Sequence, residues 1–148
     1  GMTNASMPSG SVLQVVQFSD RNASRVSSTS TSYVTTGISK AITPKRNNSI
    51  IIVEANTSMT DTPASNGEMV GKIKINGTDW ADSGQYALGY AYQPTGRYYG
   101  MYFSSNYTVS SLSTLTFEIF FKSNSSGVEV RWVDGTSSVS MTLTEIAV

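Results

Sequence analysis

Apolar and polar residues alternate along most of this chain with a period of two. The clearest case lies near the C-terminus, where the residues change character at every step through SVSMTLT (residues 138–144). Successive side chains of a β-strand point to opposite faces, so this pattern predicts a strand with one buried and one solvated face. No stretch repeats apolar residues at helical spacing, and we therefore predict an all-β fold.

The alternating segments are separated by turn residues and predict about nine strands. They cover residues 11–18, 33–42, 49–56, 69–75, 86–92, 98–103, 115–122, 128–133 and 138–144. A break is expected at Gly37, and Asn76-Gly77 predicts a tight hairpin turn, because this dipeptide readily adopts positive φ angles. Residues 93–96, which include Pro94 and Gly96, predict a second hairpin between strands 86–92 and 98–103. Short strands without crossover helices indicate an antiparallel β-sandwich.

Two predicted strands carry apolar residues on both faces. Residues 12–18 include Val12, Leu13, Val15 and Phe18, and residues 50–53 read IIIV. The outer face of a two-layer sandwich normally meets water, so these strands need a second cover. That cover is either another part of the same chain or another subunit.

Glu145 interrupts the pattern of the last strand. Strict alternation beyond Leu143 would point Glu145 inward and Ile146 outward. One interpretation is a β-bulge that shifts the register at this point. The other is a buried Glu145 beside a cation such as Arg131 or Lys72.

Composition narrows the range of partners. Ten basic and ten acidic residues give a formal net charge of zero, and only 14% of residues are charged. This excludes the basic surface of a nucleic-acid-binding protein, and we predict no nucleic-acid partner. No apolar run approaches the roughly 20 residues of a membrane-spanning helix, so no membrane insertion is predicted. We expect one domain over residues 11–148, preceded by a lead-in over residues 1–10 in which Gly1 before Met2 looks like a tag remnant.

Several segments resemble a recurring domain of tailed-phage structural proteins that is abundant in marine phages. The segments are PSGSVLQVV (residues 8–16), SYVTTGI (32–38), ITP (42–44), IIIV (50–53) and MTLTEIA (141–147). The resemblance covers both ends and the first third of the chain, while residues 61–112 show no family motif. It implies a jelly-roll-like β-sandwich, similar to tumour-necrosis-factor and complement-head folds, in the distal part of a virion tail fibre.

Such domains are commonly trimers without catalytic activity of their own, so the resemblance implies a homotrimer located in the virion. Three sandwiches packed about an axis would bury a face that a monomer exposes. We expect the first and last strands to be adjacent in the sheet and to contribute to that interface. The predicted interface residues are Val12, Leu13, Val15, Phe18, Leu143 and Ile146.

Tyrosine is concentrated in the middle of the chain. Seven of the eight tyrosines in the chain fall at positions 86, 90, 92, 98, 99, 102 and 107. Tyrosine offers a broad, rigid face with a polar tip, which suits recognition of a protein or a sugar. Tyrosine is also a good strand residue, and cross-strand packing explains the same cluster. The candidate receptor-binding residues are Arg97, Tyr98, Tyr99, Tyr102 and Tyr107.

Trp80 lies between Asp79 and Asp82 after the Asn76-Gly77 turn. It could offer an aromatic platform for a sugar ring, and we include it among the candidate ligand-binding residues. It could equally close one end of the sandwich. Two aspartates fall short of the oxygen ligands that a calcium ion needs, so we predict no metal site. Trp132, in a strand, fits core or interface packing.

The sequence offers little material for catalysis. It contains no histidine and no cysteine, which removes the commonest general base, the thiolate nucleophile and the usual zinc ligands. No pair of carboxylates is marked out by its spacing. We predict a non-enzymatic domain without a cofactor, which mediates virion assembly and binds a host-surface glycan or protein. The alternative is a stand-alone carbohydrate-binding module.

Overall fold

The chain forms two antiparallel sheets in a computed structural model that describes residues 3, 6–60, 67–80, 90–93, 98–132 and 138–148. Sheet A contains β1 (Val12–Asp20), β2 (Val26–Ser28), β4 (Ile50–Thr60), β8 (Tyr98–Thr108), β10 (Val130–Trp132) and β11 (Val139–Ile146). Sheet B contains β3 (Val34–Ile42), β5 (Gly67–Ile75), β6 (Thr78–Asp79), β7 (Tyr90–Gln93) and β9 (Leu115–Ser123). The all-β fold predicted from the alternating pattern is confirmed.

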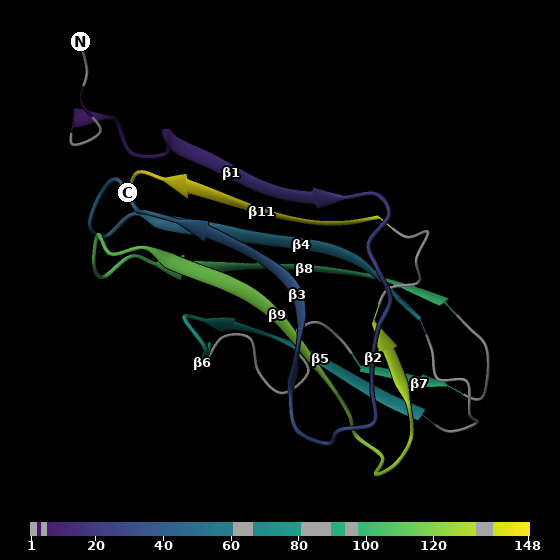
Figure 1. Cartoon of the computed structure of the whole chain (residues 1–148). Helices are drawn as coiled ribbons and strands as arrows, with labels where there is room; N and C mark the ends of the chain where they lie inside the picture. The colour runs from purple at the N-terminus through teal and green to yellow at the C-terminus, as the bar shows by residue number, and fades with distance from the viewer. Residues whose placement is uncertain (1–2, 4–5, 61–66, 81–89, 94–97, 133–137) are drawn as a thin grey trace.

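The strand pairs are nested along the chain. β5 pairs with β7, β4 with β8, β3 with β9, and β1 with β11, each antiparallel. Successive nested pairs fall alternately in sheet B and sheet A, which is the arrangement of a jelly roll. The predicted adjacency of the first and last strands is therefore confirmed, and Figure 1 shows β1 and β11 side by side.

The core fills the space between the inner faces of the two sheets. In β9, Phe117, Ile119 and Phe121 are fully buried and alternate with half-buried residues. In β11, Val139, Met141 and Leu143 do the same from the other sheet. The period-two pattern therefore maps directly onto the burial of these strands.

The turns predicted from the sequence are confirmed in part. Asn76 and Gly77 have φ angles of 50° and 79° and join β5 to β6, as the dipeptide predicts. Gly37 has a φ of 76°, and the β3–β9 register shifts around it, as expected. The second hairpin prediction is wrong, because β7 pairs within sheet B and β8 pairs within sheet A. The connection between β7 and β8 therefore crosses from one sheet to the other.

Within the described part of the chain, no helix has both the length and the apolar character needed to cross a membrane.

Candidate functional site

The outer face of sheet A carries two rows of residues that run across neighbouring strands. In the first row, Val12 of β1 pairs with Ile146 of β11, which pairs with Ile50 of β4. In the second row, Val15 pairs with Thr144, which pairs with Ile52. We call the five apolar residues of these rows the apolar face; they are Val12, Val15, Ile50, Ile52 and Ile146.

The apolar face is open to water in the single chain. Val12 and Val15 are 52% and 56% exposed, and the three isoleucines are half-buried. Isolated apolar side chains are common on protein surfaces, but a contiguous group on one sheet face is typical of an interaction surface. The interpretation that the chain itself covers both faces of these strands therefore does not hold for Val12 and Val15.

A β-bulge creates this face. The β1–β11 register shifts between Val12 and Gln14, so Leu13 is an extra residue opposite the last strand. An uninterrupted strand would place Val12 on the same side as Gln14 and Phe18. The bulge turns Val12 to the outer face beside Ile146 instead.

The structure places some of the predicted interface residues on the outer face of sheet A and others in the core. Val12, Val15 and Ile146 lie on the outer face, and Leu13 is half-buried at the bulge. Phe18 packs against the core, and Leu143 is fully buried within it. For these last two the interface prediction is wrong, because the alternation of β1 and β11 points them between the sheets.

Glu145 lies directly behind the apolar face, on the inner side of β11. Its side chain is fully buried. The backbone amides of Lys45 and Arg46 donate to its carboxylate at 2.9 and 3.1 Å, and Ser49 Oγ donates at 2.6 Å. Gln14 Nε2 donates to the second oxygen, Oε2, at 2.6 Å. The carboxylate thus joins β1, β11 and the loop over residues 43–49.

This network decides between the two interpretations of Glu145. The bulge exists, but it lies in the partner strand β1 and leaves Glu145 pointing inward. The buried position is confirmed, while the proposed cations are not its partners. Arg131 pairs with Glu129 at 3.2 Å, and Lys72 forms an ion pair with Asp79.

The hydrogen bonds keep Glu145 ionised despite its burial. Burial by itself raises the pKa of the carboxyl group. Hydrogen bonds from Ser49, Gln14 and the two backbone amides favour the charged form and outweigh burial. The pKa of Glu145 therefore lies below its ordinary value of 4.5.

The candidate receptor-binding residues are also separated. Tyr102 projects from β8 onto the outer face of sheet A and is 66% exposed, and its hydroxyl donates to Glu54 at 2.7 Å. This bond raises the pKa of Tyr102 above its ordinary value of 10.0. Tyr107 lies five positions along the same strand, points inward and packs against the core. Tyr98 and Tyr99 belong to β8, but the structure describes only their backbone. Arg97 lies outside the described residues.

Trp80 is part of the core, which corrects its prediction as a sugar platform. It is buried and makes edge-to-face contacts with Phe103, Tyr107 and Phe117 at centroid distances of 5.9 to 6.2 Å. The alternative interpretation is that Trp80 closes one end of the sandwich, and the contacts place its indole within the core.

The neighbouring Asp79 is engaged by lysines. Lys72 and Lys74 both form ion pairs with its carboxylate, the second at 3.5 Å. The hydrogen bond from Lys72 lowers the pKa of Asp79 below its ordinary value of 3.8. Among the described residues there is no cluster of three acidic side chains that could hold a metal ion.

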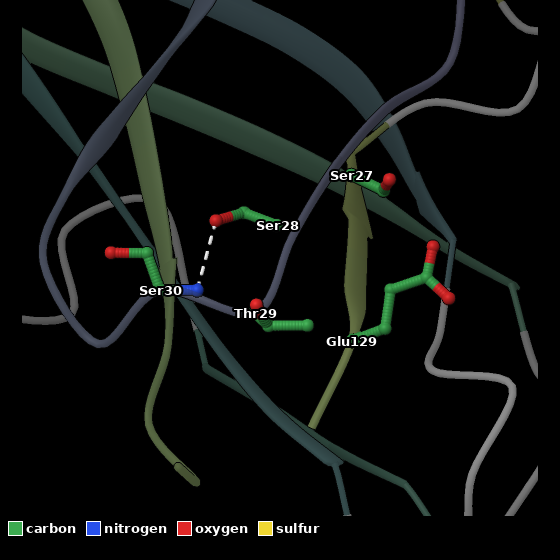
Figure 2. A pocket seen from close by; sticks show the side chains of 5 residues that line it. All are labelled: Ser27, Ser28, Thr29, Ser30 and Glu129. Atoms are coloured by element: carbon green, nitrogen blue, oxygen red, sulfur yellow. Dashed lines mark hydrogen bonds between the residues drawn. The ribbon is translucent and has the colours of Figure 1, made fainter. Parts of the chain in front are cut away.

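A hydroxyl-lined pocket of about 520 Å³ lies at the end of sheet A near β2 and β10. Its walls are Ser27, Ser28, Thr29, Ser30 and Glu129. Figure 2 shows the Ser28 hydroxyl pointing to the Ser30 backbone amide, which donates to Ser28 Oγ at 3.0 Å, while the Ser30 hydroxyl points away. Glu129 projects from the neighbouring segment, and its hydrogen bond to Arg131 lowers the pKa of its carboxyl group below the ordinary 4.5. A run of serine and threonine residues is the only feature of the sequence that points to this pocket.

Comparison with known proteins identifies a solved structure with a similar fold but no family model or curated protein with a similar sequence. No family model and no curated protein matches the chain. Dimeric latent PorU from Porphyromonas gingivalis superposes on 97% of this chain with a TM-score of 0.51 and 10% sequence identity. The chain spans 14% of the length of that PorU chain. At this identity the likeness shows the fold alone, and it agrees with the β-sandwich described above.

Proposed function

We propose that this chain is a non-enzymatic virion structural domain that assembles with copies of itself through the apolar face. The carrying observation is the exposure of Val12 and Val15 beside Ile146, Ile50 and Ile52 on one sheet. A second copy packed on this face would remove these side chains from water, at about 25 cal/mol per Å² of apolar area. The assembly is a homotrimer in the distal part of a tail fibre, which the resemblance of the sequence favours.

Electrostatic repulsion between copies of the chain does not oppose this packing. The chain has a formal net charge of zero, so copies do not repel one another strongly. In the second row Thr144 stands between Val15 and Ile52, and neither row contains a charged residue at these paired positions. Removal of the face from water therefore leaves no unpaired charge buried.

Sedimentation equilibrium at micromolar concentration tests the assembly. The expected mass is three times the 15.9 kDa of one chain. Val15→Lys places a charge in the second row and is expected to shift the protein to monomer. Gln17→Lys is the matched control, because Gln17 is exposed on the same face of β1 but outside the rows. A wild-type protein that sediments as a single chain would contradict the proposal.

The proposed task of this assembly is recognition of a host-surface glycan or protein. Tyr102 supports this part, since it is a large, exposed aromatic residue whose hydroxyl is held by Glu54. Tyr102→Ala is expected to abolish adsorption to host cells, while Asn106→Ala on the same strand is expected to retain it. Equal adsorption of the two variants would contradict this role for Tyr102.

The alternative is a stand-alone carbohydrate-binding module. It is supported by the hydroxyl-lined pocket, because serine and threonine hydroxyls can exchange hydrogen bonds with a sugar. This alternative predicts a monomer that binds a glycan and loses affinity on Ser28→Ala. The subunit count therefore separates the two functions.

A further inference from the structure

The first strand of sheet A is interrupted after Asp20. β1 ends at Asp20 and the strand resumes as β2 at Val26. Asp20 pairs with Val139 of β11, and Val26 pairs with Trp132 of β10. The interruption therefore lies beside the ends of β10 and β11, which both pair antiparallel with β4.

The opposite sheet is irregular at the same place. The register of β3 shifts between Thr35 and Ser39, around Gly37 with its φ of 76°. Residues from both irregular places, together with Trp132 and Val139, line one pocket of about 190 Å³. Regular strands would have filled this space with alternating side chains, so the two irregularities together create the pocket.

The wall of this pocket is mainly apolar. Phe18, Ala23, Val26, Ile38 and Val139 contribute aliphatic and aromatic surface. An apolar cavity of about 150 Å³ in another protein holds one benzene molecule. The volume therefore suits a ring of about six to seven heavy atoms.

Trp132 also lines the pocket and carries an unmet hydrogen-bonding group. Its side chain is fully buried, and within the described part of the chain its Nε1 atom has no hydrogen-bond partner. Buried polar groups are nearly always paired, because an unpaired donor has lost its bonds to water. A molecule that brings an acceptor to this N–H therefore gains an interaction that the protein alone does not make.

Two polar side chains that line the pocket are already engaged. Thr36 Oγ1 donates to the Ile119 carbonyl at 2.7 Å and accepts from the Ile38 amide at 3.1 Å. Asp20 Oδ1 accepts from the Asn22 amide at 2.9 Å. The carboxylate of Asp20 disfavours an anionic ligand.

We propose that this pocket binds a small, neutral, mainly apolar molecule whose single acceptor atom takes a hydrogen bond from Trp132 Nε1. The Nε1 atom lies below the water-accessible surface. The proposal therefore includes a small rotation of the indole towards the pocket. The proposal is independent of the assembly proposed above, because none of the five residues of the apolar face lines this pocket.

Nuclear magnetic resonance of the ¹⁵N-labelled chain tests this site directly. The two tryptophans give two indole N–H signals, which Trp132→Phe assigns. The probes are cyclohexanone and methylenecyclohexane, which have nearly the same shape and differ in the acceptor. Cyclohexanone is expected to shift the Trp132 signal downfield, to leave the Trp80 signal in place, and to bind about tenfold more tightly than methylenecyclohexane.

Two variants complete the test. In Trp132→Phe the two probes are expected to bind equally, because the donor is gone. Val26→Phe fills the pocket and is expected to abolish binding of both probes, with the Trp80 signal reporting that the fold persists. An unmoved Trp132 signal at the solubility limit of cyclohexanone, or equal affinities of the wild type for both probes, would overturn the proposal.

Discussion

Gln14 and Glu145 are 131 positions apart in sequence and face each other across the β1–β11 pair. The Gln14 side-chain amide uses both of its N–H groups, one on Glu145 Oε2 at 2.6 Å and one on the Thr43 carbonyl at 2.7 Å. The first strand, the last strand and the loop before β4 therefore share one polar centre. This centre lies where β1 begins and β11 ends, two strands that Figure 1 shows side by side.

Glu145→Gln should destabilise the domain. The glutamine amide would place an NH₂ group among donors that now meet a carboxylate oxygen, which leaves at least one buried donor unpaired. The expected loss in the free energy of unfolding is about 1–3 kcal/mol, measured by urea denaturation. Glu54→Gln is the matched control, because Glu54 lies on the outer face of β4 and should change stability by less than about 0.5 kcal/mol. Equal effects of the two substitutions would contradict the role given to the buried carboxylate.

The stability conferred by Glu145 should depend on pH. The pKa of Glu145 in the folded chain is below its ordinary value of 4.5, so the folded state favours the ionised form. Its contribution is present above about pH 4.5 and is lost as the pH falls through the folded pKa. The difference in unfolding free energy between wild type and Glu145→Gln should therefore be smaller near pH 3 than near pH 7. A difference that stays constant down to about pH 3 would refute this ionisation.

Gly77→Ala should weaken the β5–β6 turn. The φ of Gly77 is 79°, a left-handed conformation that costs an L-residue roughly 1–2 kcal/mol. Thermal and urea denaturation should both show a lower stability for Gly77→Ala than for the wild type. Gly100→Ala is the control, because Gly100 has no positive φ and a Cβ there would meet no atom within 4 Å. If Gly100→Ala were the more destabilising of the two, backbone conformation would not be the cause.

Trp80→Ala and Tyr102→Ala should differ sharply in stability. Trp80 makes three edge-to-face ring contacts in the core, and its removal should lower the unfolding free energy by about 3–5 kcal/mol. Tyr102 is largely exposed, so its removal should change stability by less than about 0.5 kcal/mol. Calorimetry of the two variants checks the contrast. A small loss for Trp80→Ala would mean that its ring packing contributes little.

Much of the fold was predictable because strand geometry is local. The alternation in residues 138–144 correctly predicts a strand with one buried face, although Leu143 of that face is among the predicted interface residues, and Asn76-Gly77 correctly predicts its turn. The same parity could have separated Tyr102 from Tyr107, since residues five apart on one strand point to opposite faces. Grouping them as one receptor-binding set ignored this geometry.

Other features depend on contacts between distant segments. Residues 50–53 are apolar at every position, so the pattern alone does not say that Ile51 and Val53 face the core while Ile50 and Ile52 face outward. The connection after β7 has the composition of a hairpin turn, yet its flanking strands join different sheets. Turn residues specify a change of direction and not the sheet that the next strand joins.

The sequence by itself determined the strand content and the buried face of each regularly alternating strand, because both follow from the period of two. Only the tertiary structure decided that Glu145 points inward, how its carboxylate is satisfied and where the pocket beside Trp132 opens. The donors to Glu145 come from Gln14 and residues 45–49, and the pocket requires irregularities in β1 and β3 to meet beside Trp132. The contact between Lys45 and Glu145 joins residues 100 positions apart, and no local pattern of side chains records it.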